Sequence, residues 1–317
     1  MISRRQLRIK VLQTLYAYYK GGKDSIQQSE RELNHNVEKA YELYHYLLIL
    51  IVDITLYGES RIELARNKRI PTEEDLNPNT RFIDNKLTHI IRNNERLLRA
   101  VENQKINWAD YPELIKELFN EVQQSDFYKE YMALPETSFS EDKKVISRIY
   151  TDIIFLNESL SQVLEEKSIY WNDDLEFIIS MIIKTLKKFK DTEGEEQQLL
   201  DLYKNDDDRL FAVKLVRMSI LHCDEYMAYI KSNTKNWDLE RIAFMDILIM
   251  QMAITELLNF PSIPTKVTLN EYLDIAKFYS TSKSNVFING VLDKVAEQLR
   301  SEKKLIKSGR GLIGEND

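Results

Sequence analysis

Hydrophobic residues recur at helical spacing along almost the whole chain. In the first segment, Leu7, Val11 and Leu15 are four residues apart, and Gly21 and Gly22 follow. Apolar residues at this spacing line one face of an α-helix, and glycine marks the end of a helix. No window shows the strict alternation that is typical of a β-strand. The pattern predicts an all-α protein whose first helix covers residues 3–20.

The same spacing predicts nine further helices. The second region, from about residue 37 to residue 68, contains Gly58, where we expect a bend or a break. The other predicted helices cover residues 81–102, 111–122, 142–166, 173–190, 208–232, 239–258, 268–279 and 284–301. The chain has only 8 Gly and 6 Pro, which favours long helices and short loops. The residues after Lys307 are polar and rich in glycine, and predict a disordered tail.

Two local signals mark the C-terminal region. Thr268 is followed three residues later by Glu271, which is the pattern of a capping box and predicts that a helix begins there. Gly290 lies inside the last predicted helix, where glycine costs roughly 1 kcal/mol relative to alanine. Such a glycine indicates that a backbone or a ligand comes close.

A weak repeat of acidic residues and tryptophans runs through the chain. Each tryptophan lies 13 residues after an acid, in the pairs Glu95 and Trp108, Glu158 and Trp171, and Asp224 and Trp237. One interpretation is chance combined with helix–turn–helix packing, with one tryptophan filling each corner. The other is a duplication of helical hairpins. In either case, aromatic residues and amphipathic periodicity predict an ordered helical segment rather than a linker.

Charge is unevenly distributed along the chain. The 317 residues carry a formal net charge of −7. Residues 1–20 nevertheless contain five Lys or Arg and no acid, and residues 262–317 contain nine Lys or Arg against seven Asp or Glu. Phosphate binding depends on local clusters of positive charge rather than on the total. The acidic balance therefore does not exclude a nucleic-acid partner.

The sequence offers no catalytic constellation. The four histidines, His35, His45, His89 and His222, do not have the spacing of metal ligands, and there is no glycine-rich phosphate loop. Cys223 is the only cysteine, so no internal disulfide forms and a reducing compartment fits. The longest apolar run, residues 46–52, is too short to cross a bilayer. These observations predict a cytoplasmic protein that is not an enzyme and needs no cofactor, metal or membrane.

Three motifs together resemble the NusB family of bacterial transcription antitermination factors. They are Arg4-Arg5-Gln6-Leu7-Arg8, then Ile263-Pro264-Thr265-Lys266-Val267-Thr268-Leu269-Asn270-Glu271, then Phe287-Ile288-Asn289-Gly290-Val291-Leu292-Asp293-Lys294. The resemblance covers residues 1–20 and about 208–297. It implies NusB-like helical bundles at residues 1–67 and 205–307, an inserted helical segment at residues 68–204, and the tail at residues 308–317.

The resemblance also implies a function and a site. The chain would bind a single-stranded boxA-like RNA together with NusE, the ribosomal small-subunit protein. Within the RNA polymerase antitermination complex it would promote read-through in rRNA operons. The implied RNA-binding residues are Arg4, Arg5, Arg8, Tyr16, Gln251, Phe287 and Asn289, and the implied partner-binding residues are Glu240 and Asp246.

Physical chemistry is compatible with these roles, although each residue also has a purely structural interpretation. Guanidinium groups present forked donors to phosphates, aromatic rings stack on unpaired bases, and acids suit a basic protein partner. The arginines could equally be a solvated helix end, and the aromatic residues could be core. We expect Arg4, Arg5 and Arg8 to form one basic surface next to Phe287 and Asn289.

Two other functions remain open. Gln6 and Val286 stand where the family has basic residues, which would fit a protein-binding helical scaffold with a decayed RNA surface. The chain could also be a NusB-like module of the rRNA methyltransferase type that lacks the catalytic domain.

Overall fold

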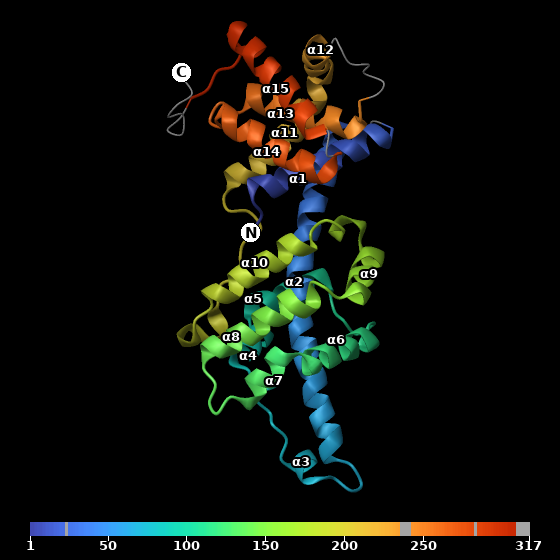
Figure 1. Ribbon diagram of the computed structural model, residues 1–317, viewed down its shortest axis with the longest axis vertical. Helices are drawn as coiled ribbons and strands as arrows, with labels where there is room; N and C mark the ends of the chain where they lie inside the picture. The colour runs from blue at the N-terminus through green and yellow to red at the C-terminus, as the bar shows by residue number, and fades with distance from the viewer. Residues whose placement is uncertain (23–24, 235–241, 282–283, 309–317) are drawn as a thin grey trace. The chain divides into compact units, whose positions relative to one another are not determined.

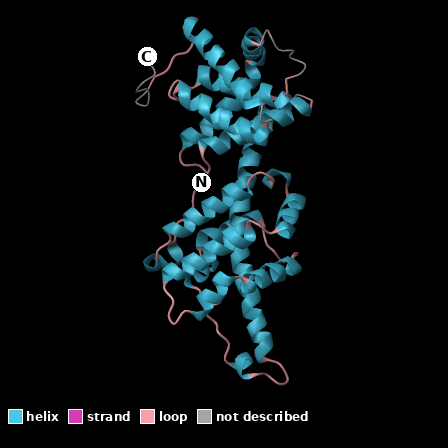
Figure 2. Cartoon of the chain, in the orientation of Figure 1, coloured by secondary structure: helices cyan, strands magenta, loops and turns pink. Residues whose placement is uncertain are grey.

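The chain is helical throughout the part that the structure describes. The computed structural model describes residues 1–22, 25–234, 242–281 and 284–308, and these contain helices and loops but no strand (Figures 1 and 2). The all-α prediction is confirmed. The chain divides into two compact units: unit 1 comprises residue 1 and residues 38–202, and unit 2 comprises residues 2–37 and 203–317. Residues 38–67, which we expected with the N-terminal part, thus group with the central segment; the four-part division remains a prediction.

Unit 1 is built around the greater part of one long helix, α2 (Ile26–Arg66). Residues Leu43 to Ile54 of α2 include core side chains on every side of the helix, as expected of a helix that is surrounded by others. The other elements of unit 1 are α3 (Glu73–Leu76), α4 (Lys86–Arg92), α5 (Glu95–Gln104), α6 (Pro112–Gln124), α7 (Asp126–Ala133), α8 (Phe139–Arg148), the π-helix η1 (Ile149–Ile154), α9 (Glu158–Lys167), the 3₁₀ helices η2 (Ile169–Trp171) and η3 (Asp191–Glu196), and α10 (Leu175–Lys188).

We expected a bend or a break at Gly58, and the break is wrong, because helix α2 continues through this residue without interruption. A Cβ built on Gly58 would lie 2.7 Å from Cε2 of Phe119. The glycine therefore allows the Phe119 ring to pack directly against the backbone of α2. A close approach by a neighbour, not a break in the helix, accounts for glycine at this position.

Two tryptophans of the repeat pack against the same residue of α2. The rings of Trp108 and Trp171 stack on Tyr46, with centroids 3.9 and 5.6 Å away. Trp108 donates its indole N–H to the carbonyl of Tyr46, and Trp171 donates its own to the carbonyl of Lys39. Each follows a ten-residue helix, α5 or α9. The third tryptophan, Trp237, lies outside the described residues.

Asparagine caps divide helices that periodicity had joined. The side chain of Asn94 accepts from the backbone N–H of Leu97 and begins α5, and Asn157 begins α9 in the same way. The expected helices 81–102 and 142–166 are therefore each interrupted. The expected helix 208–232 is also two helices, which meet at His222.

Unit 2 is a bundle centred on one apolar helix. It contains α1 (Arg4–Lys20), the first turns of α2, α11 (Asp206–Leu221), α12 (Cys223–Asn233), α13 (Phe244–Asn259), α14 (Thr265–Tyr279) and α15 (Ser284–Ser301). Helix α13 packs against α1, α11, α12, α14 and α15 (Figure 1). Residues 248–257 of α13 are all buried, which fits their nearly uncharged sequence.

The start of α14 differs from the capping-box prediction. The helix begins at Thr265, after Pro264, and therefore includes Thr268 in its interior. The Thr268 hydroxyl donates to Glu256 instead of capping a helix. Glu271 accepts from arginines of α1. Both side chains of the apparent capping box thus make tertiary contacts.

Candidate nucleic-acid and partner interface

Helix α1 fixes the positions of the three arginines. Ser3 caps the helix by accepting from the backbone N–H of Gln6, and Leu7, Val11 and Leu15 are buried, as the periodicity predicted. The helix ends at Lys20 before Gly21, as expected. It packs against α11 and α13. The arginines therefore emerge beside these helices rather than on an isolated helix end.

Arg8 forms a buried ion pair with Glu256 of α13. Nε and Nη2 of Arg8 donate to the two carboxylate oxygens at 2.8 and 2.7 Å, and the side chains are 3 % and 0 % exposed. Thr268 and Tyr272 of α14 donate to the same carboxylate at 2.9 and 3.1 Å. Burial acts to lower the pKa of Arg8, but the hydrogen bonds and charge of Glu256 outweigh it and raise that pKa above its usual value. This pair is a structural element of the bundle.

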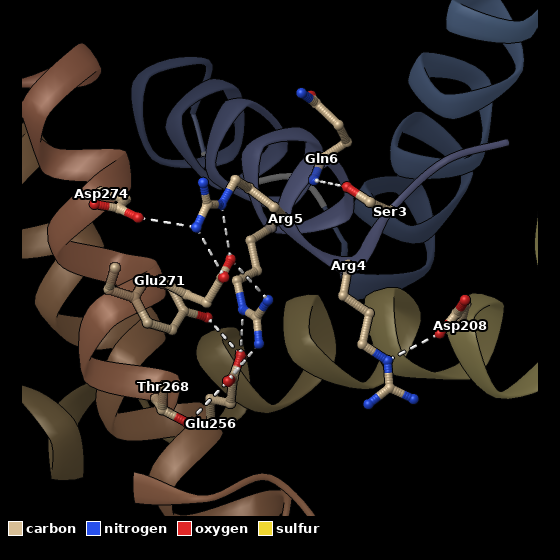
Figure 3. A network of polar contacts seen from close by, with 11 residues as sticks. Ser3, Arg4, Arg5, Gln6, Asp208, Glu256, Thr268, Glu271 and Asp274 are labelled. Carbon is tan, nitrogen blue, oxygen red and sulfur yellow. Dashed lines mark hydrogen bonds and ion pairs between the residues drawn. The ribbon is translucent and has the colours of Figure 1, made fainter. Parts of the chain in front are cut away.

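Arg5 is held by two carboxylates of α14 (Figure 3). Its guanidinium donates to both oxygens of Glu271 at 3.0 and 2.9 Å and to Asp274 at 2.9 Å. Arg8 also reaches Glu271, at 3.3 Å, so that one carboxylate joins the two arginines. Lys277 donates to Asp274 at 2.7 Å. The bond from Lys277 and the charge of Arg5 lower the pKa of Asp274.

Arg4 has a carboxylate partner of its own. Its Nε donates to Asp208 of α11 at 2.8 Å (Figure 3), and its guanidinium lies 5.3 Å from the centre of the Phe211 ring. All three predicted RNA-binding arginines are thus ion-paired within unit 2. We call Arg5, Arg8, Lys277, Glu256, Glu271 and Asp274 the arginine network.

Aromatic side chains gather where α1 ends and α13 begins. Tyr16 is 42 % exposed and its ring lies 5.8 Å from that of Phe244. Tyr19 packs edge-on against Phe244, and Lys20 lies 4.4 Å from the centre of the same ring. The Tyr16 ring is therefore in contact with Phe244 and still partly exposed to solvent.

The predicted residues of α15 are accessible to different degrees. Phe287 is half-buried, and Asn289 is exposed. Gly290 is also exposed, and no heavy atom outside its helix lies within 4 Å of a Cβ built there. The close approach expected at Gly290 is therefore not made by another part of the described chain.

The predicted residues of α13 are buried. Gln251 is 1 % exposed and donates to the hydroxyl of Tyr19 and to the carbonyl of Ser219. Asp246 is 4 % exposed and accepts a hydrogen bond from Ser280, at the end of α14. Both side chains hold neighbouring helices together, and their ligand-binding roles remain predictions. Glu240 lies outside the described residues.

The structure brings some of the predicted RNA-binding residues into contact with a shared partner or onto packed helices, but not all of them. Arg5 and Arg8 share Glu271, and Gln251 and Tyr16 lie on the packed pair α13 and α1. Phe287 and Asn289 belong to α15, which packs against α12, α13 and α14. A single surface that includes both the arginines and Phe287 stays a prediction.

Sequence reasoning missed the carboxylates that hold the arginines. Glu256 had a signal of its own, since it is the first charged residue after the uncharged run 247–255 of a core helix. Glu271 also had a signal, but it was interpreted as part of a capping box, whereas Asp208 and Asp274 look like ordinary acids on a helix surface.

The described residues show neither a metal cluster nor a membrane helix. Within residues 1–22, 25–234, 242–281 and 284–308, no group of three or more His, Cys, Asp and Glu is placed to hold a metal ion. In the same part of the chain, no helix is long and apolar enough to span a bilayer.

Comparison with known proteins identifies relatives of this chain. The family model described as the NusB family matches residues 176–297. The transcription antitermination protein NusB of Salinibacter ruber is 38 % identical over 139 residues, which is 42 % of this chain and 87 % of that protein. The NusB proteins of Chloroherpeton thalassium and Natranaerobius thermophilus are 40 % and 45 % identical, over 32 % and 22 % of this chain and about half of their own lengths (49 % and 51 %).

No solved structure matches the chain significantly. The Salinibacter relative is nevertheless covered over most of its length at substantial identity. The chain therefore belongs to the NusB family.

Proposed function

We propose that this protein is a cytoplasmic, non-enzymatic transcription antitermination factor. It binds single-stranded boxA-like RNA together with NusE, as part of the RNA polymerase antitermination complex, and promotes read-through in rRNA operons. The observation that carries the proposal is the 38 % identity to a transcription antitermination protein over 87 % of its length.

The geometry of unit 2 supports an RNA surface formed by accessible residues. The side chain of Arg5 is 47 % exposed, Tyr16 is 42 % exposed, and Asn289 is exposed. An arginine, an open aromatic ring and an amide are the groups that hold a phosphate, a base face and a base edge in single-stranded RNA. Arg8 and Gln251 would contribute by positioning α1 rather than by direct contact, since both are buried.

The test is RNA binding by the full chain, with and without purified NusE. Fluorescence anisotropy of a labelled single-stranded boxA RNA should show weak binding alone, tighter binding with NusE, and weakening at high salt because phosphate contacts release counterions. Arg5→Gln should reduce binding, while Arg300→Gln, an equal charge change at the exposed end of α15, should not. Equal binding of a scrambled RNA would contradict boxA recognition.

One observation favours a second function. Arg4, Arg5 and Arg8 are all paired with carboxylates, as a protein-binding scaffold with a decayed RNA surface would allow. Binding of NusE without any RNA binding, at low as well as high salt, would establish the scaffold instead.

A further inference from the structure

The arginine network is electrically balanced. Three cationic side chains face three carboxylates: Arg5, Arg8 and Lys277 against Glu256, Glu271 and Asp274. A phosphate that approaches α1 at this point meets no net positive charge. The basic N-terminal sequence therefore overstates the attraction of the folded protein for RNA.

The network has an inner and an outer part that differ in accessibility. The inner pair, Arg8 and Glu256, is 3 % and 0 % exposed and closed to solvent. The outer pair, Arg5 and Asp274, is 47 % and 34 % exposed. An exposed ion pair contributes at most about 1 kcal/mol. The contact between Arg5 and Asp274 can therefore be exchanged for another anion, whereas the inner pair cannot.

The carboxylates accept from three of the five N–H donors of the Arg5 guanidinium. Nη2 of Arg5 donates to Glu271 and Asp274, both at 2.9 Å, and Nε donates to Glu271. Arginine binds phosphate through the same forked donors that it uses for carboxylate. RNA and Asp274 therefore compete for one guanidinium.

We propose that Asp274, assisted by Glu271, sets the RNA affinity of this surface by competing with phosphate for Arg5. The inference rests on the proposed RNA binding. A nucleic acid that offers only a phosphate gains little by displacing Asp274. One that also stacks on Tyr16 or is held by NusE gains enough to do so. The acid thus lowers the net gain that an RNA phosphate makes by binding Arg5.

The test compares two Asp→Asn substitutions in the full chain. Asp274→Asn removes the negative charge that faces Arg5 and Lys277, while Glu271 still accepts from Arg5. Asp224→Asn makes the same charge change at an exposed position of α12. With labelled single-stranded boxA RNA, Asp274→Asn should bind roughly two- to five-fold tighter than Asp224→Asn, the range that an exposed ion pair covers. Its plot of log affinity against log salt should be steeper by about 0.7, the increment for one more phosphate contact in a single strand.

Two further measurements separate the explanations. Arg5→Gln in the Asp274→Asn background should abolish the gain, since the gain depends on Arg5. A scrambled single-stranded RNA should also gain, but no more than boxA RNA, because the contact at Arg5 is to phosphate and carries no sequence information. If the unsubstituted protein binds RNA and Asp274→Asn binds no tighter than Asp224→Asn, the competition is refuted and RNA binding stands. If neither the unsubstituted protein nor any variant binds RNA, both the competition by Asp274 and the proposed RNA binding are wrong.

Discussion

At the scale of single residues, Glu256 shows how one buried charge organises unit 2. Arg8 of α1 and both Thr268 and Tyr272 of α14 donate to its carboxylate. Arg8 and Glu256 are 248 residues apart in the chain, so no local pattern could reveal the pair. The resemblance implies that the Arg8 guanidinium binds RNA. In the structure this guanidinium is buried and instead binds Glu256, which joins α1 to α13.

Removal of Arg8 should be costly. Arg8→Met leaves the Glu256 carboxylate buried without its counter-ion, and loss of one partner of a buried pair costs about 3–5 kcal/mol. Arg4→Met is the matched control, because the side chain of Arg4 is 40 % exposed and its pair with Asp208 should contribute at most about 1 kcal/mol. Urea denaturation measures the loss in the free energy of unfolding for each variant. Equal losses in the two variants would show that burial does not set the contribution of these pairs.

His45 should make unit 1 sensitive to acid. It is 3 % exposed, and burial lowers its pKa to about 4 despite the hydrogen bond with Gln104. The usual value is about 6.5. Below that pH the unfolded chain takes up a proton that the folded chain does not, so stability is lost as the pH falls from about 6.5 towards 4. The loss should be on the order of 3 kcal/mol relative to His45→Gln, measured by urea denaturation at several pH values.

Asp53 provides a control of opposite sign for this experiment. Burial raises its pKa to about 6, so the folded state takes up a proton more readily than the unfolded state as the pH falls. Asp53→Asn should therefore stabilise the protein above pH 6, by an amount that shrinks towards pH 4. Parallel pH profiles for the unsubstituted protein and the His45→Gln variant would refute the role of His45.

At the scale of elements, the sequence predicts where helices occur better than where they end. The spacing of apolar residues located the helices, because a helix that buries one face has apolar residues at every third or fourth position. It missed the interruptions at Asn94 and Asn157, because a capping asparagine looks like any polar residue on a helix surface. Gly58 also led us to expect a bend or a break, whereas the close approach of the Phe119 ring accounts for glycine at this position. Contacts of this kind depend on the tertiary fold.

Two helical glycines should respond oppositely to alanine. Gly58→Ala places a Cβ 2.7 Å from the buried ring of Phe119 and should destabilise the protein by about 1–2 kcal/mol. Gly290→Ala meets nothing within 4 Å and should stabilise it by about 0.5–1 kcal/mol, the gain in helix propensity. Thermal denaturation gives both values. A stabilising Gly58→Ala would mean that Phe119 moves aside freely.

At the scale of the whole molecule, each unit has a buried helix at its centre. In unit 1 it is α2, with Leu43 to Ile54 in the core, and in unit 2 it is α13, with residues 248–257 buried. Periodicity predicted a helix at both places, over residues 37–68 and 239–258, whereas the resemblance left only residues 68–204 without a counterpart. Aromatic content and scarce glycine still indicated that the central segment is ordered.

Amide hydrogen exchange should show two separate maxima of protection. Residues 43–54 and 248–257 should exchange slowest, because core helices open only with the unfolding of their surroundings. Arg8→Met should speed exchange in the second segment more than in the first, since Glu256 lies in α13. Rapid exchange throughout residues 81–190 would refute an ordered central segment.

The stacking of Trp108 and Trp171 on Tyr46 also provides a built-in optical probe. Both indoles are 2 % exposed and should emit at the short wavelengths of a dry environment. Trp237 is the third and last tryptophan of the chain. Trp237→Phe would therefore confine tryptophan emission to unit 1, and a shift of that emission to longer wavelength would follow the opening of this unit alone. Unfolding of unit 2 would then be visible by circular dichroism but silent in the tryptophan emission.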